Sequence, residues 1–92
     1  MIVSFANEET KRIFDGHRSR SYATVQAVAE RKLRMLNQAR GLMDLREPPG
    51  NRLEALKGSR AGRFSIRIND QYRVCFRWED DNAYEVEIVD YH

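Results

Sequence analysis

The sequence predicts an α+β domain in which N-terminal helices pack on one face of an antiparallel β-sheet. Two patterns and the chain length support this prediction. Apolar residues recur at helical spacing in the first half of the chain and alternate at strand spacing in the second half. The chain has 92 residues, of which 41% are apolar and 33% charged, so we expect a single domain over residues 1–92 with one small core.

The N-terminal segment predicts a short strand, a short helix and a loop. Ile2–Phe5 alternates weakly, as a short strand would. Asn7 is suited to cap a helix that runs through Phe14, and Gly16 is suited to the left-handed residue that ends such a helix. Residues 17–23 are polar and have no apolar period, which is typical of a loop.

The longest helix is predicted over residues 24–43. Its apolar residues follow the three-to-four spacing of one helical face: Val25, Val28, Ala29, Leu33, Leu36 and Ala39. The other face carries four basic residues: Arg31, Lys32, Arg34 and Arg40. Pro48 and Pro49 follow, and proline cannot continue a helix because it lacks the N–H donor and clashes with the preceding turn. The chain therefore changes its type of structure within residues 44–51.

After Gly50 the apolar period becomes two, which predicts strands linked by tight turns. The predicted strands cover residues 53–57, 63–68, 72–78 and 84–89, with a glycine-bounded loop over 58–62. One face of this sheet is apolar and is expected to be the core face: Phe64, Ile66, Ile68, Tyr72, Val74, Phe76, Trp78, Tyr84, Val86 and Ile88. The opposite face is left open and carries Arg63, Arg67, Arg73 and Arg77.

Charge is unevenly distributed along the chain. Residues 17–73 hold thirteen basic against five acidic side chains, a net charge of +8, whereas residues 74–92 have a net charge of −5. Such asymmetry favours a surface that binds a polyanion. The alternative is that these charges are scattered over a solvated surface with no common partner.

Other features exclude several classes of protein. Cys75 is a single cysteine, so it forms no intramolecular disulfide and anchors no cysteine-rich zinc site, and no metal or cofactor is predicted. No apolar run approaches the roughly 20 residues of a membrane span, and the first residues turn polar too early for a signal peptide. We therefore expect a cytoplasmic protein with no membrane association.

Two groups of residues carry functional chemistry. Arg67 and Arg73 flank the same predicted turn on the same face, so their guanidinium groups are expected to reach one phosphate. Cross-strand ion pairs with Glu85 or Glu87 are the alternative. The chain ends in Asp90, Tyr91 and His92, which supply a carboxylate, a phenol and an imidazole for proton transfer or base stacking, although terminal histidines are often idle.

Three segments of the second half form a specific pattern: LEALKG at residues 53–58, RFSIRINDQYRVCFRW at 63–78 and VEIVDYH at 86–92. In this order they resemble the HigB branch of the RelE toxin superfamily, also called plasmid-maintenance killer proteins. The resemblance extends over essentially the whole chain from Ile2. It implies helices on an antiparallel sheet, and an endoribonuclease that enters the ribosomal A site and cuts the mRNA there. It also implies a cognate helix-turn-helix antitoxin of the HigA kind.

The resemblance implies a catalytic surface made of Lys57, Arg67, Arg73, Asp90, Tyr91 and His92, with Asn69 in support. The remaining candidate RNA contacts are basic: Arg18, Arg20, Arg31, Lys32, Arg34, Arg40 and Arg63. RNA contains its own nucleophile, the 2′-hydroxyl, so such a site can cut RNA without metal by aligning that oxygen and neutralising the phosphate. Arg67 and Arg73 would clamp the phosphate, Tyr91 would stack on a base, and Asp90 and His92 would transfer protons.

The chain departs from the superfamily pattern at Glu54, where some members have a histidine just before the lysine–glycine loop. This departure argues against a mechanism that needs two histidines. His17 lies in the basic loop and is expected to be a surface residue or an RNA contact. Two other functions remain open for the same sequence: a non-catalytic RNA-binding module, and a degenerate toxin that acts through protein interaction alone.

Overall fold

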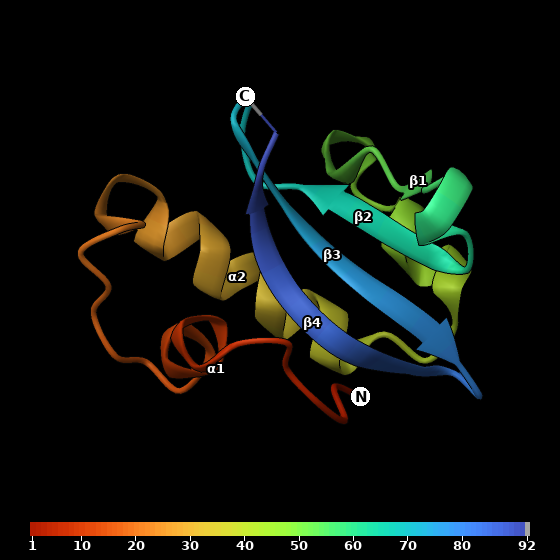
Figure 1. Ribbon diagram of the computed structural model, residues 1–92, viewed down its shortest axis with the longest axis horizontal. Coiled ribbons are helices and arrows are strands. Elements are labelled where there is room, and N and C mark those ends of the chain that lie inside the picture. The colour runs from red at the N-terminus through yellow and green to blue at the C-terminus, as the bar shows by residue number, and fades with distance from the viewer. Residues whose placement is uncertain (92) are drawn as a thin grey trace.

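A four-stranded antiparallel sheet with helices on one face makes up the protein (Figure 1). The structure is a computed structural model and describes residues 1–91. The strands are β1 (Glu54–Ala55), β2 (Arg63–Arg67), β3 (Tyr72–Glu79) and β4 (Asn82–Asp90), which lie in the order β1-β2-β3-β4. The α+β class and the helices on one face of an antiparallel sheet are therefore confirmed.

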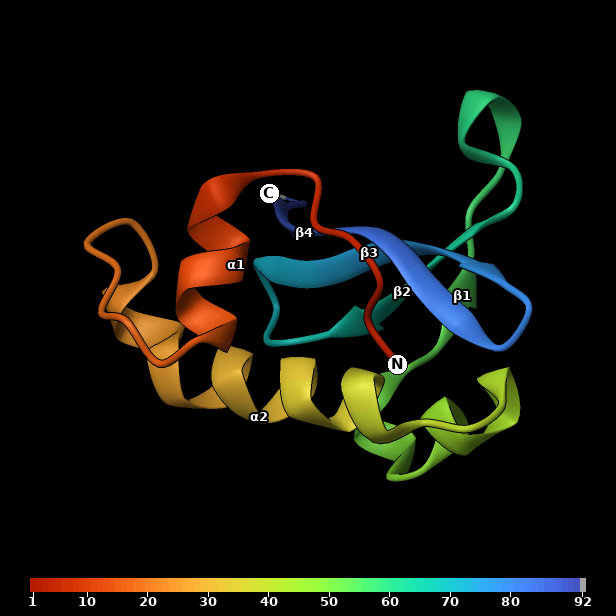
Figure 2. The same cartoon turned by 90° about the horizontal axis from the view of Figure 1, so that it is seen from below.

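Two α-helices, α1 (Glu8–Phe14) and α2 (Gln26–Gln38), cover the apolar face of the sheet. Figure 2 shows α2 running beneath the sheet, with α1 packed against α2 and β4. The start of α1 is as predicted, because the Asn7 Oδ1 atom accepts a hydrogen bond of 2.9 Å from the Thr10 amide. Gly16 follows α1 with a φ angle of 92°, in the left-handed region.

The α2 helix is shorter than the predicted range of residues 24–43. A 3₁₀ turn, η1 (Ala23–Val25), precedes it, and Ala39 turns extended at its end. The amides of Arg40 and Gly41 donate to the Asp44 carboxylate at 2.9 and 3.1 Å, so a side chain replaces the helical acceptors. Two further 3₁₀ turns, η2 (Leu42–Arg46) and η3 (Pro49–Asn51), then lead toward β1.

The core lies between the helices and the sheet. Its buried apolar residues are Ile13, Val25, Ala29, Leu33, Leu36, Ala39, Leu45, Ile66, Ile68, Val74, Phe76, Ala83, Val86 and Ile88. The helical and strand periods of the sequence identify most of this set. Burial of each large apolar side chain stabilises the fold by about 1.5–3 kcal/mol, so a core of this size suffices for one small domain.

Two predicted strands are much reduced. Residues 2–5 form isolated parallel bridges, Ile2 with Ala83 and Phe5 with Val86, along the outer edge of β4. This segment covers hydrogen-bonding groups that an edge strand would otherwise expose. The strand predicted over 53–57 is limited to β1, because the chain enters from a left-handed Arg52 and leaves into a 3₁₀ turn, η4 (Gly58–Arg60).

A β-bulge in β4 changes which side chains reach the open face. Cys75 pairs with Glu87 and Arg77 pairs with Tyr84, so two residues of β4 oppose Phe76 alone. Glu85 adopts a φ angle of 53° at this point, and its amide donates to Ser4 Oγ at 2.9 Å. The prediction that Tyr84 belongs to the core face is wrong, because the bulge shifts the alternation. Ala83 takes the core position instead, and Trp78 packs partly buried against the core as expected.

Candidate active site

The open face of the sheet presents arginines in opposed pairs. In the register of β2 and β3, Arg67 lies opposite Arg73, and Arg63 lies opposite Arg77. Directly opposed residues place their side chains on the same face of a sheet. This arrangement agrees with the prediction that these four arginines share the face away from the helices.

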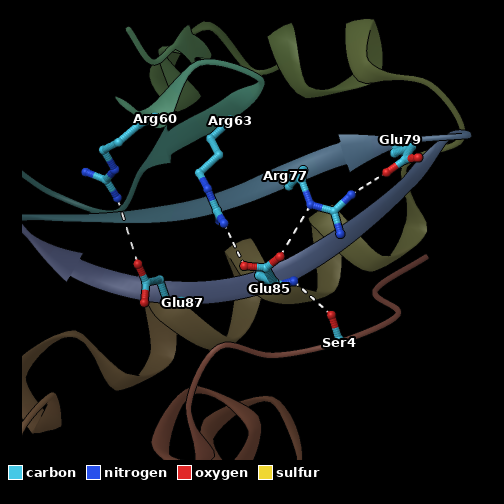
Figure 3. A network of polar contacts seen from close by, with 7 residues as sticks. All are labelled: Ser4, Arg60, Arg63, Arg77, Glu79, Glu85 and Glu87. Carbon is cyan, nitrogen blue, oxygen red and sulfur yellow. Dashed lines mark hydrogen bonds and ion pairs between the residues drawn. The ribbon is translucent and has the colours of Figure 1, made fainter. Parts of the chain in front are cut away.

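One end of this face is neutralised by carboxylates (Figure 3). Arg63 Nη2 lies 2.6 Å from Glu85 Oε2, and Arg77 Nε lies 3.4 Å from Glu85 Oε1. Arg77 also forms an ion pair with Glu79, and its guanidinium carbon lies 4.6 Å from the centre of the Tyr84 ring. The hydrogen bond from Arg63, followed by its charge, lowers the pKa of Glu85 below its usual value.

The other end contains Arg73, which is held by neutral oxygens among the described residues. Its Nε donates to Ser65 Oγ at 2.8 Å, and its Nη2 donates to the Arg52 carbonyl at 2.6 Å and to the Ser65 carbonyl at 3.4 Å. A guanidinium has five N–H donors, and here Nη1 forms no hydrogen bond with any residue in the described range. Arg73 is therefore both fixed in position and able to bind an anion.

A pocket of about 590 Å³ lies between the β1–η4 segment and the end of β4, and it reaches Arg73 through the ring of its lining residue Tyr91. It is lined by Glu54, Ala55, Leu56, Lys57, Arg60 and Tyr91. The side chain of Lys57 is exposed and forms no hydrogen bond or ion pair with another residue between 1 and 91. Arg60 lies 3.8 Å from Glu87, a loose ion pair on the surface (Figure 3).

Tyr91 is positioned on the same face by three contacts. Its amide donates to the Gln71 carbonyl at 2.7 Å, its hydroxyl lies 3.7 Å from Cys75 Sγ, and its ring centre lies 5.9 Å from the Arg73 guanidinium carbon. The residue is 41% exposed. Partial burial, followed by the contact with Cys75, raises the pKa of the Tyr91 phenol. The ring is therefore a neutral, partly exposed aromatic surface at the pocket.

Arg67 and Asn69 lie at the β2–β3 turn. Arg67 Nη2 pairs with Asp70 Oδ1 at 2.5 Å, and this hydrogen bond lowers the pKa of the exposed Asp70 carboxyl. Asn69 Oδ1 accepts hydrogen bonds from the amides of Gln71 and Tyr72 at 2.9 and 2.8 Å, so its side chain shapes the turn. Arg67 faces the Arg73 side of the sheet, whereas the Asn69 amide oxygen is committed to the backbone.

The terminal motif is divided between the two faces of the sheet. Asp90 pairs with Tyr72, whose ring packs on Tyr22 of the helical layer, so Asp90 lies on the side opposite the pocket. Its Oδ2 atom accepts a hydrogen bond of 3.1 Å from Gln71 Nε2. The structure thus does not bring Asp90 together with Lys57 and Tyr91 in the pocket lining. His92 lies outside the described residues.

Two grooves of the helical layer are lined in part by basic residues. Arg31 and Arg34 line a groove of about 360 Å³ along the C-terminal half of α2. Arg18 and Arg20 line another, of about 350 Å³, near the N-terminal end of α2. Arg40 is exposed just beyond α2. These arginines lie on the surface, as the prediction of RNA contacts requires.

Lys32 is the exception, and its predicted place on the exposed basic face is wrong. Its side chain is only 7% exposed, and Nζ lies 2.5 Å from the Oδ1 atom of the fully buried Asn51. Burial, followed by the charge of Arg31, lowers the pKa of Lys32. The η2–η3 segment folds over Lys32 and covers it, which the helical period of the sequence does not reveal.

Sequence reasoning missed three contributors to the site. Arg60 reaches the pocket from a loop without apolar alternation, and Arg52 contributes a backbone carbonyl, which leaves no trace in residue type. Ser65 is fully buried on the open face, opposite Cys75, because Arg73 covers it. A small polar residue between arginines on an open strand face was the available signal for Ser65. The alternative of cross-strand ion pairs applies to other arginines: Glu85 pairs with Arg63 and Arg77, and Glu87 pairs with Arg60. Within the described chain, neither carboxylate pairs with Arg67 or Arg73.

Two further properties of the described residues concern metals and membranes. Between residues 1 and 91, no three His, Cys, Asp or Glu side chains gather in a way that could hold a metal ion. In the same part of the chain, neither helix has the length and apolar character needed to cross a bilayer.

Comparisons with known proteins identify relatives of the chain. It is 47% identical over 61 residues to Toxin HigB-1 of Vibrio cholerae and 39% identical over 56 residues to an uncharacterised protein of Haemophilus influenzae. These matches cover 66% and 61% of this chain but 64% and 55% of the two relatives, less than two thirds of the length of either.

The fold resembles a chain of the solved YoeB-YefM complex from Staphylococcus aureus, with a TM-score of 0.62 and 19% identity over 100% of this chain and 98% of that one. At this identity the likeness supports the RelE-like fold alone. The model of the HigB-like toxin family, described as the RelE-like toxin HigB of type II toxin-antitoxin systems, matches residues 3–92. The chain therefore belongs to the HigB-like family of RelE-like type II toxins.

Proposed function

We propose that this protein is a ribosome-dependent endoribonuclease that cuts mRNA in the A site, as the toxin of a type II toxin-antitoxin system. The observation that carries the proposal is the pocket beside Arg73. There an exposed aromatic ring, Tyr91, adjoins two basic groups that form no ion pair with a described carboxylate, Lys57 and Arg73, and a third, Arg60, whose ion pair with Glu87 is loose. RNA is the ligand that matches both features, because bases stack on aromatic rings and phosphates bind guanidinium and ammonium groups.

Arg73 and Arg67 would bind the scissile phosphate. They are directly opposed on β2 and β3, and the Nη1 donors of Arg73 remain available for a phosphate oxygen. Arg67 would exchange its partner Asp70 for the phosphate. The free-energy cost of breaking this ion pair is small because Asp70 is exposed to solvent. Lys57 would add a third positive charge from the other side of the pocket. Charge placed where the phosphorane oxygens become more negative stabilises the transition state more than the ground state.

Tyr91 would stack on a base next to the cut and so align the chain. Its raised pKa keeps the phenol protonated at neutral pH, so we assign it a stacking and positioning role and not that of a general base. Alignment matters because in-line attack of the 2′-hydroxyl on the adjacent phosphorus requires the two reacting atoms to be held in one geometry. The products would be a 2′,3′-cyclic phosphate and a 5′-hydroxyl.

Proton transfer is assigned to His92 of the terminal motif and to Glu54. His92 would serve on one side of the phosphate. Asp90 lies on the other face of the sheet, where it accepts a hydrogen bond from the Gln71 side chain. The Gln71 carbonyl in turn accepts from the Tyr91 amide. Asp90 is therefore suited to holding the chain end in place. Glu54 lines the pocket at the position where some relatives have a histidine, so a carboxylate is available there as a proton acceptor.

The reaction is proposed to need no metal ion. Two-metal phosphoryl transfer requires several carboxylates gathered around the scissile phosphate. Among the described residues Glu54 is the single carboxylate of the pocket lining, whereas Glu79 lies at the far turn of the sheet and Glu85 is engaged by Arg63 and Arg77. The 2′-hydroxyl of RNA supplies the nucleophile, so no metal-bound water is required.

Contact with the ribosome would be made by the two arginine grooves of the helical layer, which carry Arg18, Arg20, Arg31 and Arg34. Such contacts bind phosphates without reading sequence, so they would position the toxin on ribosomal RNA. A cognate HigA-like helix-turn-helix antitoxin is proposed as the protein partner, in keeping with the family.

Induction of this chain alone in bacterial cells tests the proposal. We expect growth to stop and translated mRNAs to acquire new 5′ ends within their coding regions, while untranslated RNAs stay intact. Growth arrest without new 5′ ends would indicate binding without cleavage. Neither effect, from a protein that is folded and that binds its antitoxin in a separate experiment, would indicate a degenerate toxin.

A further inference from the structure

A buried polar cluster lies next in sequence to Arg52, whose carbonyl binds Arg73, and the chemistry described so far does not use it. Asn51 is fully buried; its Oδ1 accepts from Lys32 Nζ at 2.5 Å, and its Nδ2 donates to the carbonyls of Leu45 and Glu47, both at 3.2 Å. These contacts join α2 to the η2–η3 segment. The oxygen and the nitrogen of the Asn51 side chain both have hydrogen-bond partners inside the protein, so the cluster fixes the backbone at residue 51.

The next residue, Arg52, is held in a strained conformation. Its φ and ψ angles are 45° and 57°, in the left-handed region that residues with a side chain rarely adopt. Strain of this kind persists where the surrounding structure fixes it, and it is found mainly at functional sites. Here the amide of Arg52 donates to the Pro49 carbonyl at 3.1 Å, while its own carbonyl accepts from Arg73 Nη2 at 2.6 Å.

We propose that the buried Lys32–Asn51 pair and the left-handed Arg52 form a positioning device that presents the Arg52 carbonyl to Arg73. The proposal rests on the proposed function of Arg73 as the phosphate-binding group. Two acceptors on different elements, Ser65 on β2 and the Arg52 carbonyl after η3, then fix the guanidinium plane and leave Nη1 directed to the substrate. Lys32 acts through the backbone and does not contact RNA.

A series of substitutions at one position separates backbone conformation from charge. Arg52→Gly, Arg52→Ala and Arg52→Val all remove the exposed guanidinium, but they differ in how readily they adopt a positive φ: glycine easily, alanine at a cost, valine least. We expect the cleavage rate on saturating programmed ribosomes to fall in the same order. The valine variant should be about tenfold slower than the glycine variant, because small misplacement of a catalytic group has effects of this size or larger.

The half-saturating ribosome concentration should stay the same within about twofold across the series, because the device orients Arg73 and does not bind the ribosome. Equal rates in the three variants would overturn the proposal, and so would an effect confined to the half-saturating concentration. Circular dichroism at the assay temperature would establish that each variant is folded. A purely structural role would lower thermal stability and leave the rate of the folded protein unchanged.

A second pair of variants tests the buried lysine. Lys32→Met removes the ammonium group and keeps the length of the side chain, whereas Lys11→Met makes the same change at an exposed ion pair with Asp15 far from the site. We expect Lys32→Met to slow cleavage several-fold and Lys11→Met to leave it unchanged. An unchanged rate in Lys32→Met would show that the pair does not position Arg73.

Nuclear magnetic resonance gives a readout that does not depend on cleavage. In the parent and in Arg52→Gly, hydrogen bonding should slow rotation of the Arg73 guanidinium and give separate Nη resonances. In Arg52→Val these resonances should merge. If the parent cleaves no RNA but the resonances follow this order, the proposed function fails and the positioning device stands. If the parent cleaves RNA but the Nη resonances are identical in the parent and both variants, the proposed function stands and the positioning device fails.

Discussion

The two ends of the arginine face differ in what surrounds the same residue type. At the β3–β4 end, Arg63 and Arg77 share the Glu85 carboxylate, and the Arg77 guanidinium also lies over the Tyr84 ring. At the β2–β3 end, Arg73 is held by neutral oxygens and contacts Tyr91 of the pocket, and the opposed Arg67 pairs with the fully exposed Asp70. A cation paired with a fixed carboxylate stabilises the fold locally, whereas a cation fixed by neutral acceptors keeps its charge for a ligand. We infer the active site from this difference and not from the number of arginines.

The largest effect is expected at the second end. Arg73→Ala should reduce mRNA cleavage on programmed ribosomes by a factor on the order of 10² or more, because it removes a positive charge that stabilises the transition state. Arg73→Lys should recover part of the activity, since an ammonium group lacks the bidentate fork. Arg77→Ala, a change of the same type on the same face, should stay within about twofold of the parent. Similar reductions in Arg73→Ala and Arg77→Ala would remove the distinction between the two ends.

Removal of the aromatic ring alone should have an intermediate effect. Tyr91→Ala should slow cleavage by about ten- to a hundredfold, because a stacked base contributes about 1–3 kcal/mol. Tyr91→Phe removes the hydroxyl that lies near Cys75 Sγ but keeps the ring, so its rate should lie within about threefold of the parent. Single-turnover kinetics on the ribosome would measure both. A Tyr91→Phe variant as slow as Tyr91→Ala would indicate that the phenol takes part in the chemistry.

Deletion of Tyr91 and His92 together should inactivate the protein and leave its circular dichroism spectrum unchanged, because both residues follow the last core position, Ile88. Loss of the folded spectrum would assign the chain end to structure, and a toxic truncated protein would remove it from the mechanism.

A smaller effect, on binding alone, is expected from the helical layer. Charge reversal of the exposed Arg31, Arg34 and Arg40 should weaken ribosome association. The slope of the salt dependence of binding should decrease by about one unit for each phosphate that the variant no longer neutralises. Sedimentation with ribosomes across a salt series would measure this. Parent-like affinity at every salt concentration would show that this surface faces away from ribosomal RNA.

The smallest effect concerns the neutralised end. The folded-state pKa of Glu85 lies below its usual 4.5, so its ionised form stabilises the fold at neutral pH. This contribution is fully present above pH 4.5 and is lost as the pH falls through the lowered value. Glu85→Gln should therefore be less stable than the parent at pH 7, and the difference should vanish in acid. Thermal unfolding as a function of pH would measure the difference, and a constant difference at all pH values would contradict the assignment.

The sequence was sufficient for the fold class, for the helical cap at Asn7 and for the opposed arginines, because helical and strand periods determine these features directly. It was insufficient where the backbone departs from those periods. At the bulge, Glu85 adopts a positive φ angle although it has a side chain, and the alternating pattern of residues 84–89 does not indicate this. For this reason the sequence assigned Tyr84 to the wrong face of the sheet. Within residues 1–91, the structure brings Lys57 and Tyr91 together in one pocket, with Arg73 in contact with Tyr91, and it places Asp90 on the other face.

Tertiary contacts explain the remaining differences. Lys32 follows Arg31 on the same helix, and residue type does not distinguish them. Arg31 is exposed, whereas Lys32 is covered by the η2–η3 segment through its contact with Asn51. Backbone acceptors such as the Arg52 carbonyl are equally invisible, since every residue has one. Such features depend on which loop folds over which helix, and a periodic pattern contains no information about that.

The most direct test of the central claim, that this site cuts RNA through the 2′-hydroxyl, uses the parent protein and programmed ribosomes. The mRNA would contain one 2′-methoxy group at the mapped cut position, and a matched mRNA would contain it two codons downstream. We predict that the first change stops cleavage and the second does not, and that EDTA at a concentration the ribosome tolerates has no effect. The fragments should end in a 2′,3′-cyclic phosphate, or its hydrolysis product, and a 5′-hydroxyl. Cleavage of the 2′-methoxy substrate at its modified position, or loss of cleavage in EDTA, would contradict the account.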